Sequence, residues 1–164
     1  MPTDRIMRPA TQADEPFLRD MIYEAVHWSD GERPSRDETF ARPEIAMLID
    51  GWGRDGDWGL VAEAADGTPI GAAWCRNWTA DHHAFGYVDD AIPEVSIALT
   101  RGDREQGLGT VLLLALFDQA RSRGYSKLSL AVERTNYRAQ HVYEKLGFMR
   151  IGGTDEDFLM VLDL

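Results

Sequence analysis

A strand, a glycine-rich turn, an apolar helix and a second strand follow one another between residues 94 and 132, and this succession constrains the fold most. Apolar residues alternate along 94–100, as in a strand with one buried face. The run VLLLALF within 107–123 is too apolar for a solvated helix, so a buried helix is expected there. Alternation returns at 128–132. This order predicts a parallel pair of strands with a right-handed crossover.

Turn signals on either side complete the architecture. Asp66-Gly67 supplies the positive φ of a tight hairpin, so residues 60–64 and 70–74 are expected to pair antiparallel. The order of elements predicts one domain over 1–164, with a mixed sheet and helices on both faces. Before the hairpin we expect a strand at 5–8, a helix at 17–26 with Thr11 as its N-cap, and a loop excursion over 28–58 that contains a short helix at 43–50. After the hairpin we expect a long loop at 77–92, a helix at 136–146, and strands at 148–151 and 158–162.

The chain is acidic: 17 Lys and Arg stand against 28 Asp and Glu, which gives a formal net charge of −11. Nucleic acid and anionic membranes repel such a chain, so neither is expected as a partner. The longest apolar run is far shorter than the about 20 residues of a membrane span. The start MPTDRIMRPA lacks the apolar centre of a signal peptide, which predicts a cytoplasmic protein. The charge also suits a cationic substrate, although acidity more often serves only solubility.

The turn at residues 104–109, Arg-Glu-Gln-Gly-Leu-Gly, lies directly before the buried helix. Glycines there let the backbone approach a ligand closely, and the first N–H groups of a helix have no acceptor within it. Together they can form a socket for phosphate, although glycine at such a turn can equally be turn chemistry alone. No Gly-Lys-Ser/Thr follows, and Leu112 stands where a dinucleotide fingerprint needs its third glycine, so neither of those motifs is present.

A second motif follows some distance beyond the glycine turn. It is Asn136-x-x-Ala139-x-x-x-Tyr143-x-x-x-Gly147-Phe148, within NYRAQHVYEKLGF. With Arg-x-x-Gly-x-Gly before it, the chain resembles the GNAT superfamily of acyl-CoA-dependent N-acetyltransferases. The resemblance extends more loosely to IMRPATQADEPFLRDMIYEA and VAEAADGTPIGAAW, and it leaves 28–58 and 77–92 as the variable parts.

The resemblance implies a fold and a reaction. The fold is α/β (α+β), with a mixed, mostly antiparallel sheet, a central parallel splayed strand pair and helices on both faces. The strand at 94–100 is expected to carry a bulge and to diverge from its parallel neighbour, which opens a slot for the pantetheine arm. The reaction is transfer of the acetyl group of acetyl-CoA to a primary amine by direct attack in a ternary complex.

The resemblance also implies which residues hold acetyl-CoA. Backbone N–H groups of the turn bind the pyrophosphate, and an N–H near Leu99 or Ile97 polarises the thioester carbonyl. Glu105 places a negative charge near the pyrophosphate, which Arg101 and Arg104 could offset. The cofactor-binding residues implied are Ile97, Ala98, Leu99, Arg104, Glu105, Gln106, Gly107, Leu108, Gly109, Thr110, Asn136 and Tyr143.

Two catalytic residues follow from the same resemblance. Tyr143 matches the tyrosine that protonates the departing thiolate, and the alternative is core packing one turn from Ala139. Glu94 matches a carboxylate that acts as general base through water, and the alternative is a solvated residue at the strand end. Asn136 can serve both as a cofactor contact and as a helix N-cap.

Other candidates for the base are weaker. The second family position for a base is occupied by Ala131, and Glu133 is a fallback two residues further on. His82 and His83 are expected to form a surface pair, and His141 to be exposed. The four histidines lack metal-site spacing with supporting carboxylates, so no metal is expected.

The acceptor is a small-molecule or peptide amine, and a homodimer is compatible with the resemblance. A non-catalytic acyl-CoA-binding or regulatory protein on the same fold, and an unrelated nucleotide-binding α/β domain, are the competing functions. Aromatic and acidic residues of the variable segments could form a groove for a cationic amine, or the aromatic ones could simply fill the edges of the core. They are Trp28, Trp52, Trp58, Trp78, Phe85 and Tyr87, with Asp30, Asp50, Asp55, Asp57, Asp81, Asp89 and Asp90.

Overall fold

A seven-stranded sheet crosses the molecule in the order β1-β2-β3-β4-β5-β7-β6. The computed structural model describes residues 4–26 and 33–164. Every neighbouring pair is antiparallel except β4 and β5, which are parallel. The strands are β1 (Ile6–Pro9), β2 (Trp58–Glu63), β3 (Pro69–Arg76), β4 (Glu94–Leu99), β5 (Lys127–Glu133), β6 (Met149–Gly153) and β7 (Asp157–Asp163). The mixed sheet expected from the sequence is confirmed.

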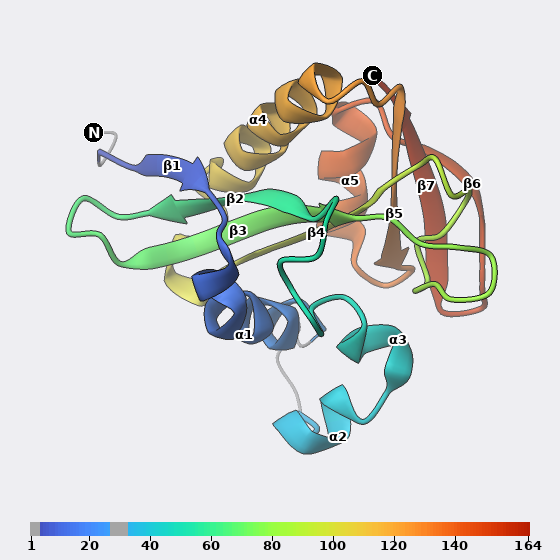
Figure 1. Cartoon of the computed structure of the whole chain (residues 1–164), viewed down its shortest axis with the longest axis horizontal. Helices are drawn as coiled ribbons and strands as arrows, with labels where there is room; N and C mark the ends of the chain where they lie inside the picture. Colours follow the sequence, from blue (N-terminus) through green and yellow to red (C-terminus); the bar gives the residue numbers. More distant parts are fainter. Residues whose placement is uncertain (1–3, 27–32) are drawn as a thin grey trace.

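Helices cover both faces of this sheet (Figure 1). On one side lie α1 (Glu15–Val26), α2 (Arg36–Phe40) and α3 (Pro43–Ala46), and on the other lie α4 (Leu108–Ser122) and α5 (Tyr137–Lys145). Two short 3-10 turns, η1 (Gln12–Asp14) and η2 (Arg101–Asp103), precede α1 and the glycine turn. Thr11 is the N-cap of η1 rather than of α1, and the Asp14 carboxylate accepts its backbone N–H at 2.7 Å.

The parallel pair is open over most of its length. Among the described residues β4 and β5 pair only at Glu94 and Ser129, where the Ser129 N–H donates to the Pro93 carbonyl at 3.0 Å. Beyond this point the strands diverge, as expected. The expected bulge in β4 is wrong: its register with β3 runs without a shift from Arg76–Glu94 to Gly71–Leu99.

Each face of the sheet carries its own core. The larger core packs α4, with Leu112 and Leu116 fully buried, against β2, β3, β5 and β7. The smaller core packs Leu18 and Ile22 of α1 against Val61 and its strand neighbours. Because both faces are covered, the central strands are apolar on both sides, and the open seam between β4 and β5 is the place where a ligand can enter the sheet.

The segment before β2 differs from the expected single helix. Helix α2 was not expected, and it begins at Ser35, whose hydroxyl accepts the Glu38 N–H at 3.1 Å. The helix expected over 43–50 ends at Ala46 and continues only as turns, because Gly51 and Gly53 with φ of 67° and 102° turn the chain away.

A buried ion pair joins this segment to the sheet. The Arg76 guanidinium donates to both carboxylate oxygens of Asp57, at 3.2 and 3.0 Å, and to the Met47 carbonyl at 2.7 Å. Both charged side chains are 2% exposed. Burial acts to raise the pKa of Asp57, but the hydrogen bonds from Arg76 and Arg54 outweigh burial and lower it.

Removing one partner of this pair leaves a buried charge, so we expect Asp57→Ala to reduce the free energy of unfolding by about 3–5 kcal/mol at pH 7. Asp118→Ala removes the partner of an exposed pair with Arg121 and is the control, with an expected cost below about 1 kcal/mol. Because the folded-state pKa of Asp57 is depressed, the wild-type advantage is present at neutral pH and is lost as the pH falls through that pKa. Urea unfolding measures both, and equal costs for the two variants would contradict the assignment.

Candidate active site

A cleft of about 1270 Å³ opens where β4 and β5 diverge. Its walls come from β4, β5, the starts of α4 and α5, and the α1–α3 segment. The expected site residues Glu94, Asn136 and Tyr143 all line it. Gln106 and Leu108 do not: the Gln106 amide bonds the Gly102 carbonyl at 3.0 Å, and the Leu108 side chain is buried in the larger core.

The glycine turn presents backbone N–H groups at the start of α4. Gly107 is the N-cap, with φ of +80°, and a Cβ placed on it would meet open space. The helix bond of Val111 to the Gly107 carbonyl, at 3.2 Å, leaves the N–H groups of residues 108–110 ahead of it without helical acceptors. These groups and the positive end of the helix dipole form an anion site at the cleft.

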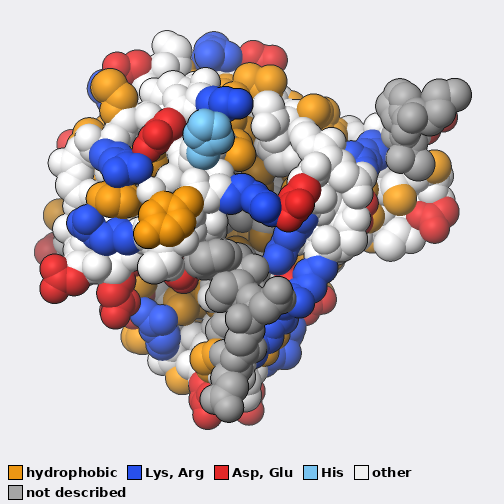
Figure 2. Space-filling model, turned by 180° about the vertical axis from the view of Figure 1, so that it is seen from behind, with side chains coloured by type: hydrophobic (Ala, Val, Ile, Leu, Met, Phe, Trp, Pro, Cys, Tyr) orange, Lys and Arg blue, Asp and Glu red, His pale blue; other side chains and the backbone are white. Residues whose placement is uncertain are grey.

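Arginines reinforce this end of the cleft despite the acidic composition. Figure 2 shows Lys and Arg side chains gathered in a line across the middle of the face opposite to Figure 1. Arg104 lines the cleft and donates to the backbone carbonyl of Glu24 at 3.3 Å and to its carboxylate at 3.4 Å. Glu105 has a positive φ of 66°, and its carboxylate pairs with Arg138. Arg138 therefore offsets the negative charge of Glu105. The sequence predicted that Arg101 and Arg104 would offset it, but both pair with Glu24 instead.

Strand β4 directs two amides toward the gap. Thr100 donates its N–H to the Ile70 carbonyl on the β3 side at 2.9 Å. Because backbone groups alternate between the two edges of a strand, the amide of Ala98 also faces β3, and those of Ile97 and Leu99 face the diverging side. Of the three expected backbone contacts, Ile97 and Leu99 are available to a ligand in the seam, and Ala98 lines the cleft without offering its N–H.

Helix α5 places Tyr143 and Asn136 on the opposite wall. The Tyr143 ring packs edge-on against Phe148, at 5.8 Å between centroids, and burial raises the pKa of the hydroxyl to about 12. Tyr143 therefore packs into the core and reaches the cleft, so both roles considered for it are compatible. The Asn136 side chain accepts the Ala139 N–H at 3.2 Å as the N-cap of α5, and its amide nitrogen remains for another partner.

Glu94 is not a solvated residue at the strand end. It is 6% exposed, and its Oε1 accepts the Trp78 Nε1–H at 2.9 Å and the Gly86 N–H at 3.1 Å. Burial raises the pKa of Glu94 to about 7, against the lowering effect of these two hydrogen bonds. A carboxyl group of this kind gains and loses its proton near neutrality, which suits a general base.

Comparison with known proteins agrees with this geometry. The family model described as Acetyltransferase (GNAT) family matches residues 21–148. The chain belongs to the GNAT acetyltransferase family. It is 31% identical over 112 residues to the streptothricin acetyltransferase of Streptomyces lavendulae, covering 67% of this chain and 59% of that protein's length.

Solved GNAT structures share the whole fold. The PaiA N-acetyltransferase of Thermoplasma acidophilum, determined in complex with coenzyme A, superposes with a TM-score of 0.69 at 20% identity over 98% of this chain and 99% of that one. The phosphinothricin acetyltransferase of Sinorhizobium meliloti, in complex with acetyl-CoA, superposes with a TM-score of 0.70 at 20% identity over 98% and 88%. The seven-stranded GNAT architecture is therefore confirmed along the chain.

The far end of the cleft differs from the groove that the sequence suggested. Trp52, Trp58 and Trp78 are core residues, each 4% exposed or less, and Trp28 and Asp30 lie outside the described residues. None of the other suggested acidic residues lines the cleft, because those loops pack elsewhere, and Phe85 is the one aromatic of that set that does. The charged residues lining this end are Glu38, Arg42, Glu44, Glu133, Arg134, Asp155, Glu156 and Asp157.

Within this end of the cleft, Glu133 and Asp157 are opposite each other in the β5–β7 register. Burial, followed by the charges of Glu133 and Glu156, raises the pKa of Asp157. Residues 4–26 and 33–164 contain no group of three or more His, Cys, Asp or Glu arranged for a metal ion. No helix in those ranges is long and apolar enough to cross a membrane.

The raised pKa of Glu94 predicts that the free energy of unfolding depends on pH between about 4.5 and 7. As the pH rises from 4.5 the unfolded chain ionises before the folded one, so the free energy of unfolding falls until the pH passes about 7. The loss is on the order of 3 kcal/mol. Glu94→Gln keeps both hydrogen bonds without the charge, so we expect it to be about as stable as the wild type at pH 5 and clearly more stable at pH 8. Urea unfolding at both pH values measures this, with the exposed Asp55→Asn as control. A pH-independent difference between Glu94→Gln and the wild type would contradict the buried carboxylate.

Proposed function

We propose that the protein is an N-acetyltransferase that transfers the acetyl group of acetyl-CoA to a primary amine by direct attack in a ternary complex. One observation carries the proposal. A single cleft joins an amide-lined helix N-terminus, flanked by arginines, to a buried carboxyl group with a pKa of about 7 and a tyrosine hydroxyl. Binding an anionic donor, removing a proton and supplying a proton are the three tasks of acetyl transfer to an amine.

The residues present fit acetyl-CoA. The N–H groups of Leu108, Gly109 and Thr110, next to the positive φ of Gly107, suit the diphosphate, and Arg104 adds positive charge. The seam between β4 and β5 is open beyond the Glu94–Ser129 pair, which leaves room for the pantetheine arm, and the N–H groups of Ile97 and Leu99 face it. Asn136 lines the same cleft, and its side-chain amide nitrogen can donate to the donor molecule.

The chemistry divides among three groups of this chain. Glu94 takes the proton of the ammonium acceptor, directly or through a water, so that a neutral amine attacks the thioester carbonyl. The fixed N–H of Ile97 or Leu99 stabilises the oxyanion that forms as the C–N bond is made. Tyr143, protonated at neutral pH, gives its hydroxyl proton to the sulfur as the C–S bond breaks, and the proton then lost by the amide nitrogen returns to the Tyr143 oxygen through water. The acceptor class is a small molecule or a peptide with a primary amine.

Donor binding is tested by thermal melting with acetyl-CoA, and with ATP and NAD as controls. At about 100 times the dissociation constant, acetyl-CoA should stabilise the wild type by about 2.7 kcal/mol, and ATP and NAD should not. Gly107→Glu should lose this shift, because a carboxylate then occupies the anion site. Gly67→Glu is the matched control, since Gly67 has a similar φ of +86° and open space around it but lies in the β2–β3 hairpin. Stabilisation of the folded Gly107→Glu variant equal to that of the control would exclude the anion site.

The role of Tyr143 is tested by Tyr143→Phe. Removing the general acid should lower kcat by about 100-fold, with the dissociation constant of acetyl-CoA nearly unchanged. Tyr137→Phe is the control, because Tyr137 lies on the same helix, lines the cleft and is 75% exposed. Release of free thiol from acetyl-CoA with a panel of amines gives the rate. An unchanged kcat in Tyr143→Phe would remove Tyr143 from the mechanism, and acetyl-CoA binding without thiol release in the wild type would favour a non-catalytic acyl-CoA-binding protein.

A further inference from the structure

We infer that the 77–92 loop positions Glu94 for catalysis: Trp78 and Gly86 hold one carboxylate oxygen, and the other oxygen is left to face the acceptor amine. The inference rests on the proposed function. Trp78 and Gly86 are positioning residues, since they touch Glu94 rather than the reacting atoms.

Both hydrogen bonds to Glu94 end on the same oxygen. Trp78 Nε1 lies 2.9 Å and the Gly86 nitrogen 3.1 Å from Oε1. The structure records no hydrogen bond to Oε2 among the described residues, and Glu94 lines the cleft. Two donors on one oxygen fix the rotation of the carboxyl group, so the lone pairs of Oε2 keep one direction. A base oriented in this way needs no reorganisation when the amine arrives.

The position of Gly86 requires the absence of a side chain. A Cβ there would lie 2.4 Å from the Glu94 carboxyl carbon and 2.7 Å from Oε2. The Gly86 carbonyl in turn accepts the Ser129 hydroxyl at 2.5 Å, and Ser129 is the β5 residue paired with Glu94. The loop is thus tied to β5 at the only level where β5 meets β4 within the described residues.

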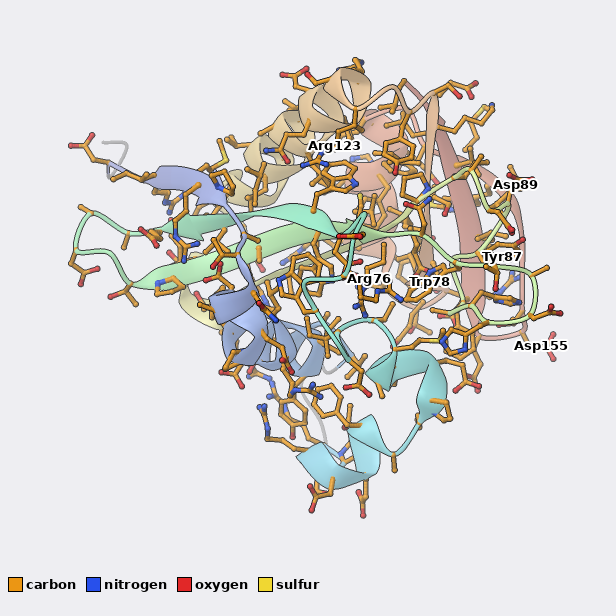
Figure 3. The ribbon with its side chains drawn as sticks, in the orientation of Figure 1. Arg76, Trp78, Tyr87, Asp89, Arg123 and Asp155 are labelled. Atoms are coloured by element: carbon orange, nitrogen blue, oxygen red, sulfur yellow. The ribbon has the colours of Figure 1, made fainter. Side chains whose placement is uncertain are left out.

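Trp78 is itself held in place. It is 4% exposed, and the guanidinium groups of Arg76 and Arg54 lie 5.9 and 5.6 Å from its ring centroids. Figure 3 shows Arg76 and Trp78 side by side, with Tyr87 and Asp89 further out on the loop. Because Arg76 is bound to Asp57 and to the Met47 carbonyl, the indole packs against a guanidinium that is itself fixed in place.

The main polar contacts of the Glu94 carboxyl group are its two hydrogen-bond donors, Trp78 and Gly86, rather than the charged groups around it. Arg76 is opposite Glu94 in the β3–β4 register but pairs with Asp57. On the same strand the Cys75 thiol is neutral, since burial, and then the charge of Glu94, raises its pKa well above its usual value. Ser129 on β5 is uncharged. The other charged groups lining this part of the cleft are Arg42, Glu44, Glu133 and Asp157.

The first test replaces the indole donor. Trp78→Phe keeps an aromatic ring and removes the hydrogen bond, so the ionised form of Glu94 loses a donor. We expect the pKa of Glu94, followed by carboxyl NMR, to rise by about one unit or more. The acidic limb of the kcat profile should move by the same amount, with the KM for acetyl-CoA unchanged. Trp52→Phe is the matched control: Trp52 is equally buried, lies 5.9 Å from the same Arg76 guanidinium, and donates to the Thr11 carbonyl instead.

The second test moves the carboxyl group with both donors retained. Gly86→Ala forces Glu94 aside, and we expect kcat to fall at least 10-fold at every pH with an unchanged acetyl-CoA affinity. Gly152→Ala, where a Cβ meets open space, is the control. This variant decides the question if Trp78→Phe does not fold. An unshifted Glu94 pKa in folded Trp78→Phe, or normal turnover in Gly86→Ala, would overturn the inference.

The outcomes separate this inference from the proposed function. If the wild type binds acetyl-CoA but acetylates no amine, the proposed function fails, and the NMR titration still reports whether Trp78 controls the Glu94 carboxyl. If the wild type is active and Trp78→Phe behaves as Trp52→Phe does in both titration and rate, the proposed function stands and the positioning role fails.

Discussion

The single pairing of β4 with β5 is the constraint on which the rest of the site depends. Among the described residues the strands pair only at Glu94 and Ser129, where the Ser129 N–H donates to the Pro93 carbonyl, and the seam is open beyond this point. An open seam in a buried sheet leaves backbone N–H and C=O groups without strand partners, which is costly unless a ligand or water takes them. The full register of β4 with β3 and of β5 with β7 stabilises both sides of the gap. The sheet can therefore remain split without losing its core.

A buried ion pair is linked, through Trp78, to the Glu94 carboxyl group at the start of this seam. The side chains of Asp57 and Arg76 form an ion pair in which each is 2% exposed, and removing either partner would leave a buried charge. Here the pair fixes the guanidinium that lies against Trp78, and Trp78 donates to Glu94. The raised pKa of Glu94 lowers the free energy of unfolding at neutral pH, so the buried carboxyl group that we propose as the base is retained at a cost in stability.

The sequence predicted the main strands and helices but not helix α2 or the contact that holds the Glu94 carboxyl group in place. The hairpin at Asp66-Gly67, the buried helix and the parallel pair follow from local rules of periodicity and turn chemistry, and the structure has each of them. Helix α2 was missed because its five residues carry too short a pattern, although Ser35 and Glu38 form a capping box. The contact between Trp78 and Glu94 was missed because it joins an irregular loop to a strand, and no periodicity relates the two residues. A glycine and a tryptophan within that loop were the only local signal.

A physical difference between the two ends of the cleft explains why the family can be recognised from the sequence and the acceptor cannot. In the function that we propose, the donor end of the cleft binds through backbone N–H groups, whose placement requires glycine at defined positions, so its motif is short and specific. The end that we propose for the acceptor is lined by side chains from α2, α3, the 77–92 loop and the β6–β7 turn, which are brought together only by tertiary packing. It carries Arg42 and Arg134 beside Glu133 and Asp157, so the net charge of the chain says little about the charge an acceptor meets. An acceptor of the kind that we propose would therefore meet a mixed arrangement of charges rather than a uniformly acidic surface.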